Sequence, residues 1–256
     1  MSMNILTHRD GPILRIEIHR PDKKNALTQQ MYADIAAAMG AAEADPGVRV
    51  MLIHGSEEAF TAGNDLQDFL SRPPRSEDSG VMRFLRTVSS TTKPLVAAVS
   101  GPAVGIGTTM LLHCDLVYAA EDARLSLPFV NLGLCPEAAS SYLLPLVAGY
   151  QRAAELLLFG EPFSAEKGRE VGIVTAVVPR EKLMDAAMAA ARKLAERPPA
   201  ALRITKQLMK RAMKAEVAEA LAEEFDHFSA RLESPEAKEA MTAFFEKRKP
   251  DFSRFG

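Results

Sequence analysis

The chain has 256 residues, 47% of them hydrophobic and 25% charged, which is typical of a globular protein with a sizeable core. Its formal net charge of -2 gives no overall basic field, so we expect no nucleic-acid partner. We expect no membrane association and a cytoplasmic location, because no apolar run approaches the roughly 20 residues that span a bilayer and the first ten residues lack the apolar core of a signal peptide.

The first half of the chain alternates short apolar runs with amphipathic segments. Residues 14–18 alternate in the manner of a strand, and Thr28 is placed to cap a following helix. The stretch 71–80 has two prolines and mixed charges, and it predicts a mobile surface loop. Further strands are predicted at 48–54, 95–99, 116–119 and 125–127. Strands that alternate with helices favour an α/β core with parallel strand pairing.

After Pro179 the pattern becomes helical. Residues 180–195 predict an amphipathic helix that Pro198-Pro199 ends, and the pattern remains helical from residue 200 onward. Ser234-Pro235 predicts another helix start, with a cap followed by proline at the first helical position. We therefore expect two parts: a core of residues 1–197 that holds the active site, and a helical region of residues 198–256 that covers the core or reaches a neighbouring subunit.

Two glycine-containing turns each lie between a predicted strand and a predicted helix. They are Ala62-Gly63-Asn64-Asp65 and the segment 101–107. A turn that opens a helix exposes backbone N–H groups that have no intrahelical partner, at the positive end of the helix dipole. Two such turns facing each other could hold an oxygen that gains negative charge, although most glycine turns only connect elements.

One carboxylate, that of Glu137, stands in the markedly apolar stretch 132–140. Two interpretations of this residue are open. It could be an acid in the first turn of a helix, where acids are favoured, or a general base whose pKa is raised by an apolar pocket. His113, on an apolar helix face, is expected to be a core residue, with Asp115 beside it orienting local backbone.

Other chemistries lack their sequence motifs. No serine lies in a Gly-x-Ser-x-Gly elbow, and Gly105-Ile106-Gly107 lacks the third glycine of a dinucleotide fingerprint. No His or Cys pairing has metal-ligand spacing, so we expect neither a metal nor a cofactor, and two cysteines without a signal peptide predict free thiols. The basic cluster of Lys206, Lys210, Arg211 and Lys214 is expected on a solvated helix face, with contact to anionic phosphates as the alternative.

These segments, in this order, resemble the crotonase superfamily, also called the enoyl-CoA hydratase/isomerase family. The resemblance covers nearly the whole chain and rests on residues 20–27, 59–66, 93–105 and 244–249. It implies an α/β fold made of a spiral of ββα units, followed by a helical trimerisation region. It also implies an acyl-CoA thioester substrate, with coenzyme A as part of that substrate, and a homotrimer or a dimer of trimers.

The resemblance assigns roles to particular positions. It implies that the backbone N–H groups of Asn64 and Ile106 form an oxyanion hole for the thioester oxygen. The remaining substrate- or CoA-binding positions that we expect on this basis are Asn25, Ala26, Leu27, Ala62, Asp65, Leu66, Phe129, Leu132 and Lys247.

The chain departs from the hydratase pattern at two positions. Thr109 and Phe129 stand where a hydratase has glutamates, and neither side chain can activate water as a carboxylate does. Glu137 matches the single base of the Δ3,Δ2-enoyl-CoA isomerases, which implies a proton shuttle from C2 to C4 of a 3-enoyl-CoA. The alternatives are an atypical hydratase or thioester hydrolase of the same family, a non-enzymatic acyl-CoA-binding protein, and RNA binding through the lysine-rich helix.

Overall fold

The structure is a computed structural model that describes residues 3–73, 76 and 78–255. A six-stranded sheet has the order β1-β2-β3-β4-β6-β9. Strands β1 (Ile5–Asp10) and β2 (Ile13–Ile18) form an antiparallel hairpin. The strands that follow all pair in parallel: β3 (Val50–His54), β4 (Leu95–Val99), β6 (Leu116–Ala120) and β9 (Ala176–Val178).

A second, three-stranded sheet has the order β5-β7-β8. Its strands are β5 (Pro102–Val104), β7 (Arg124–Ser126) and β8 (Phe163–Ser164). Strand β5 follows β4 directly through Gly101, which has φ +57° and where an added Cβ would lie 2.1 Å from the Glu58 carbonyl oxygen. Only glycine fits this corner, at which the chain passes from one sheet to the other. Strands β6 and β7 repeat the pattern, which is the ββα repeat that the resemblance implied.

Both faces of the large sheet are covered, since every residue of β3 and β4 is buried. Side chains alternate between faces along each strand. Val50 and Leu52 pack with helix α8 (Leu183–Ala195), whereas Met51 and Ile53 belong to the main core with helices α1 (Gln29–Ala44) and α3 (Gly80–Ser90). Such two-sided burial is what continuous apolar runs in a parallel sheet require.

Most elements predicted from the sequence are confirmed. The predicted strands lie within two residues of the observed ones, and the Thr28 side chain accepts a hydrogen bond from the Met31 N–H at the start of α1. Strand β1 was not predicted, and its antiparallel pairing is an exception to the expected parallel order. Helix α2 (Leu66–Ser71) and helix α3 flank the predicted loop, of which Pro74, Arg75 and Glu77 lie outside the described residues.

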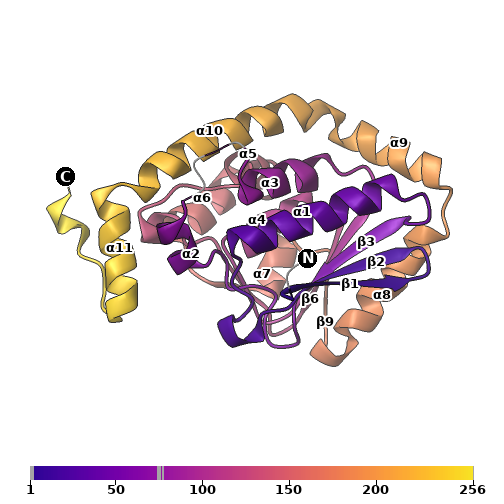
Figure 1. Cartoon of the computed structure of the whole chain (residues 1–256), viewed down its shortest axis with the longest axis horizontal. Helices are drawn as coiled ribbons and strands as arrows, with labels where there is room; N and C mark the ends of the chain where they lie inside the picture. Colours follow the sequence, from indigo (N-terminus) through magenta and orange to yellow (C-terminus); the bar gives the residue numbers. More distant parts are fainter. Residues whose placement is uncertain (1–2, 74–75, 77, 256) are drawn as a thin grey trace.

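The C-terminal part is helical. Helices α9 (Pro199–Lys210) and α10 (Lys214–Leu232) curve over the outside of the core, and α11 (Pro235–Glu246) turns down at the far end (Figure 1). Helix α11 starts as predicted, with the Ser234 hydroxyl accepting from the Ala237 N–H. The remaining helices are α4 (Ile106–Thr109), α5 (Ser140–Ala148), α6 (Tyr150–Phe159) and α7 (Ala165–Glu170). No helix in the described ranges is both long and apolar enough to cross a membrane.

One expectation about the basic cluster is wrong. Lys206 does not lie on a solvated face but is only 4% exposed, because its ammonium group reaches the carboxylate of Asp115 beneath α9. Asp115 also orients local backbone, as expected, by accepting from the Leu95 N–H. The sequence pattern did not indicate this, because a lysine is almost always exposed unless it has a buried partner, and the partner Asp115 is distant in the sequence.

Candidate active site

The first glycine turn is fastened to the segments beside it. Leu27 donates its N–H to the Gly63 oxygen at 2.8 Å and accepts from the Asp65 N–H at 2.9 Å, so that Leu27 and Asn64 form a parallel bridge. Gly63 has φ +88°, and an added Cβ would lie 2.9 Å from the Val104 oxygen at the end of β5. The two glycine turns singled out in the sequence are therefore neighbours in space.

The second turn leads directly into helix α4. Gly105, at φ 55° and ψ -115°, precedes the helix and donates its N–H to the Ser126 oxygen at 2.9 Å. Ile106 is the first residue of α4, so its N–H has no intrahelical acceptor. Among the hydrogen bonds of the described chain, neither the Ile106 N–H nor the Asn64 N–H has a protein acceptor. Two main-chain donors are thus available at adjacent turns.

The Glu137 carboxylate lies at the second of these turns. A methyl group placed on Gly105 would be 4.0 Å from Glu137 Oε1 and 3.9 Å from Phe129 Cε1. Glu137 is only 6% exposed, and within the described residues its Oε1 has no hydrogen-bond partner. A buried, unpaired carboxylate oxygen is rare in folded proteins because it lowers the stability of the fold, so its presence here points to a functional role.

The backbone around Glu137 is not helical. Ala138 and Ala139 both adopt left-handed conformations, at φ 62° and 55°, and α5 begins only at Ser140. The interpretation of Glu137 as an acid in the first turn of a helix is therefore wrong. The Ser140 hydroxyl donates to the Glu137 carbonyl oxygen at 2.6 Å, and His113 Nε2 lies 2.8 Å from the Ala138 oxygen. His113 is buried in the core, as expected.

Electrostatics favour a protonated Glu137 at neutral pH. Burial, together with the charge of Glu224, raises the pKa of Glu137 to about 8, and a hydrogen bond from the Asn64 side chain acts in the opposite direction. The Tyr32 hydroxyl donates to Asn64 Oδ1, which orients that amide. A carboxyl group whose pKa is shifted toward neutrality by its pocket is typical of functional sites.

A narrow cavity of about 20 Å³ lies at Glu137 between α3 and α10. Beside Glu137, Ala138 and Glu224, its walls are apolar: Phe69, Val81, Leu85, Leu221, Phe225 and Phe228. A larger cavity of about 830 Å³, lined by parts of α3, α9 and α10, shares Leu221 and Phe225 with it. Glu137 therefore lines a narrow, mostly apolar cavity that shares two wall residues with a wider one.

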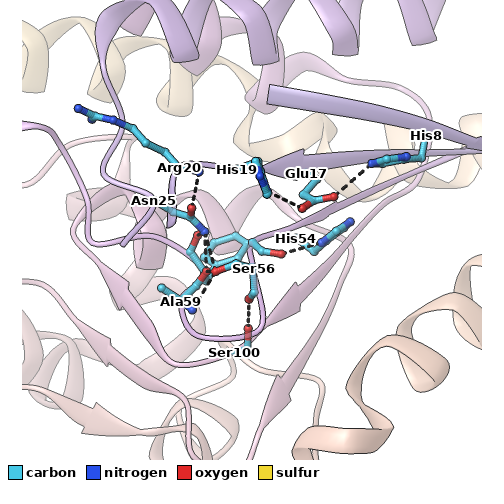
Figure 2. A network of polar contacts seen from close by, with 11 residues as sticks. His8, Glu17, His19, Arg20, Asn25, His54, Ser56, Ala59 and Ser100 are labelled. Carbon is cyan, nitrogen blue, oxygen red and sulfur yellow. Dashed lines mark hydrogen bonds and ion pairs between the residues drawn. The ribbon is translucent and has the colours of Figure 1, made fainter. Parts of the chain in front are cut away.

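Asn25 occupies a structural position beneath the first turn. It is fully buried at φ 60°, its Oδ1 accepts from the Arg20 N–H at 2.7 Å, and its Nδ2 donates to the Ala59 oxygen at 2.7 Å (Figure 2). The Ser100 hydroxyl holds the same loop by donating to the Ser56 oxygen (Figure 2). The Asn25 side chain thus shapes the segment that leads into the Gly63 turn and has no spare group for a ligand.

The other expected positions fall into two groups. Ala62, Asp65 and Leu66 build the first turn, with the Asp65 carboxylate capping α2 and accepting from Arg20 Nη1 at 2.7 Å. Buried Phe129 reaches the Gly105 turn, and half-buried Leu132 follows it in a short 3-10 turn. Ala26 and Leu27 precede helix α1 beside the first turn. By contrast, Lys247 lies at the exposed end of α11 and is not among the residues that line the Glu137 cavity.

The positions that hold glutamates in hydratases carry no carboxylate here. Thr109 is fully buried in α4, with its hydroxyl unpaired within the described residues. For metals, His8 and His19 both contact Glu17 (Figure 2), but no group of three or more ligating side chains suited to a metal occurs in the described ranges.

Sequence reasoning missed Glu224, which meets the Glu137 turn from α10. A signal for it exists in the sequence. Val217, Leu221 and Phe228 follow one helix face, and Glu224 falls on that same face at helical spacing. An acid within an apolar stripe indicates a buried carboxylate with a specific partner, because an unpaired one would be costly.

Comparison with known proteins agrees with this geometry. The family profile described as enoyl-CoA hydratase/isomerase matches residues 8–254. The chain is 38% identical to rat enoyl-CoA delta isomerase 2 over 97% of its own length and 65% of that protein, so it spans slightly less than two thirds of this relative. It is 35% identical to 1,2-epoxyphenylacetyl-CoA isomerase of Escherichia coli K12, covering 97% of this chain and 98% of that protein.

A solved structure gives the same picture. OdaA of Pseudomonas aeruginosa is 48% identical and superimposes with a TM-score of 0.93, over 95% of this chain and 99% of that one. Sequence profile, relatives and fold together place the chain in the enoyl-CoA hydratase/isomerase family, with the crotonase fold.

Proposed function

We propose that this protein is a Δ3,Δ2-enoyl-CoA isomerase, which converts a 3-enoyl-CoA thioester to the conjugated 2-enoyl-CoA with Glu137 as its single base. One observation carries the proposal. The buried carboxylate of Glu137, whose Oε1 is unpaired, adjoins a turn whose Ile106 N–H is free, next to a second turn whose Asn64 N–H is free. A base and two main-chain donors close to it are the groups that enolate chemistry needs.

The mechanism follows from the substrate. The C2 protons of a 3-enoyl thioester lie between a carbonyl and a double bond, so removing one gives a dienolate whose charge spreads onto the thioester oxygen. The Asn64 and Ile106 N–H groups stabilise that oxygen, and loss of one such donor typically raises the barrier by roughly 3–4 kcal/mol. Glu137 takes the proton from C2 and returns it at C4.

The surroundings of Glu137 suit a proton that must be both accepted and returned. A pKa of about 8 lets one carboxyl group act as base and then as acid near neutral pH. The apolar walls formed by Phe69, Leu221 and Phe225 exclude water, which protects the dienolate. Thr109 and Phe129 offer no carboxylate to activate water for hydration. The wider cavity, which also has Leu221 in its wall, offers space for the acyl chain.

We also propose a homotrimer or a dimer of trimers in the cytoplasm. Large apolar side chains are exposed on α5, α6 and α9, namely Leu146, Tyr150, Leu158, Phe159, Leu208 and Met209. Exposed apolar surface of this extent is typical of an interface between subunits. Both cysteines are free, which suits a reducing compartment. Sedimentation velocity that gives a monomer would contradict the assembly.

The deciding experiment follows 3-hexenoyl-CoA and a longer homologue spectrophotometrically. We expect Glu137→Gln to lower kcat by about 10³-fold and to retain binding of the CoA ester, while Glu121→Gln, at an exposed position, leaves kcat unchanged. Equal rates for wild type and Glu137→Gln would overturn the assignment. Water addition to 2-enoyl-CoA would indicate a hydratase, release of free CoA a thioester hydrolase, and binding without any turnover a non-enzymatic protein.

A further inference from the structure

The turn that carries Glu137 is held by a carboxylate from the C-terminal region. Glu224 Oε2 accepts from the Ala139 N–H at 2.6 Å, and its Oε1 accepts from the Ser141 N–H at 2.9 Å and from the Ser141 hydroxyl at 2.5 Å. Glu224 is itself only 7% exposed. A buried carboxylate on α10 thus takes three hydrogen bonds from one short segment that begins two residues after Glu137.

This segment needs external support because of its backbone conformation. Ala138 and Ala139 are consecutive non-glycine residues with positive φ, a conformation in which Cβ crowds the backbone. Such residues persist only where the surrounding structure holds them. The bonds to Glu224 satisfy N–H groups at the start of α5 that have no intrahelical partner.

We propose that Glu224 is a positioning residue for Glu137, and that its carboxylate holds the left-handed Ala138–Ala139 turn that aims the base at the substrate. This inference rests on the proposed role of Glu137 as the base. Glu224 lines the same cavity as Glu137, but its oxygens are occupied by the turn, whereas Glu137 Oε1 is unpaired. Because of this difference, Glu224 holds the turn, and Glu137 is left to exchange a proton with the substrate.

Glu224 also acts on Glu137 through its charge. Burial raises the pKa of Glu224, and its three hydrogen-bond donors act in the opposite direction by favouring the ionised form. That charge adds to the burial that raises the pKa of Glu137. The other titratable groups near the turn are Tyr32 on α1, Cys135 in the preceding loop, His113 under Ala138, and Glu223 and Arg231 on α10. Burial raises the pKa values of Tyr32 and Cys135 and lowers that of His113, so these three are neutral near pH 7.

The test compares kcat and KM for 3-enoyl-CoA isomerisation across pH in four variants. Glu224→Gln removes the charge and turns an N–H toward the Ala139 N–H. We expect its limiting kcat to fall roughly tenfold or more, with KM nearly unchanged, and the acid limb of the kcat profile to move down by about one pH unit. Glu224→Asp and Ser141→Ala weaken the hydrogen bonds between residue 224 and the turn, so kcat should fall. Both variants keep the negative charge, so the acid limb of the kcat profile should stay in place. Glu223→Gln, an exposed neighbour on α10, should match wild type.

The outcomes separate this inference from the proposed function. If Glu224→Gln has the kcat and the acid limb of wild type while Glu137→Gln is still inactive, only the role of Glu224 is overturned. A fall in kcat that merely tracks loss of folded protein by circular dichroism, with the acid limb unmoved, would mark Glu224 as structural and overturn it too. If Glu224→Gln does not fold, Ser141→Ala decides: unchanged kcat contradicts the proposal. Absence of wild-type turnover would sink both proposals.

Discussion

Lys206 Nζ lies 2.7 Å from Asp115 Oδ2, and this ion pair joins helix α9 to the residue that directly precedes strand β6. The same Asp115 oxygen accepts from the Leu95 N–H at 2.7 Å, and the Lys206 ammonium also donates to the Lys93 oxygen at 2.8 Å. Lys206 is only 4% exposed, so helix α9 is fastened to the sheet by an ion pair between a buried lysine and a partly buried aspartate.

Replacing Lys206 by methionine should therefore destabilise the fold. The change leaves the Asp115 carboxylate partly buried without its cation, and we expect the free energy of unfolding to fall by about 3 kcal/mol. Guanidinium unfolding followed by circular dichroism measures this. Lys214→Met, at an exposed position two turns further along the chain, is the matched control and should change stability by less than about 0.5 kcal/mol. Equal midpoints for the two variants would contradict the prediction.

Glu137→Gln should make the protein more stable in alkaline solution. The pKa of Glu137 is raised to about 8 in the folded chain from an ordinary value of 4.5, so the folded state holds a proton that the unfolded state has lost between these pH values. Wild-type stability therefore falls as pH rises through this window, and the glutamine variant lacks this loss. Between pH 5 and pH 9 we expect the variant to gain roughly 2–4 kcal/mol relative to wild type. Urea unfolding at several pH values tests this, with Glu121→Gln expected to parallel wild type.

His113 should cause the opposite dependence in acid. Burial lowers its pKa from 6.5 to about 4, so below pH 6.5 the unfolded chain binds a proton that the folded chain does not. Wild-type stability should thus fall by about 3 kcal/mol between pH 7 and pH 4 on this account. His113→Gln keeps an N–H donor for the Ala138 oxygen and should show a shallower decline. The exposed His227→Gln serves as control; a His113→Gln slope identical to wild type would refute the assignment.

Alanine substitutions at two glycines with positive φ should distinguish the effect of backbone strain from that of a steric clash. At Gly11, φ +55°, an added Cβ meets nothing within 4 Å, whereas at Gly63, φ +88°, it would lie 2.9 Å from the Val104 oxygen. Gly11→Ala should cost about 1 kcal/mol of stability and leave isomerisation unchanged. Gly63→Ala should push the two turns apart and lower kcat by about 10–100-fold. The free energy of unfolding and kcat are measured on the same preparations of each variant. Similar kcat values for the two variants would argue against an oxyanion site at these turns.

Local patterns predicted much of the core. Strand β4 was predicted with its observed bounds, since an apolar run between prolines and glycine has few alternatives in a buried parallel sheet. Strand β1 was missed because only Ile5 of its six residues is buried, which leaves no alternation to detect. The pairs Lys206–Asp115 and Glu224–Ala139 could not be predicted, since they join positions 91 and 85 residues apart in the sequence. A local pattern can mark Glu224 as buried, but it does not encode which distant segment the carboxylate contacts.

The bond from the Ala139 N–H to Glu224 has a consequence for biosynthesis. The chain leaves the ribosome N-terminus first, so both glycine turns and Glu137 emerge well before α10 is made. Until Glu224 arrives, the two left-handed alanines lack the acceptor that holds them. On the proposed mechanism, a nascent chain that stops short of α10 would hold both main-chain donors yet leave Glu137 unaimed, so that the site is completed only when residues from Lys214 onward are made.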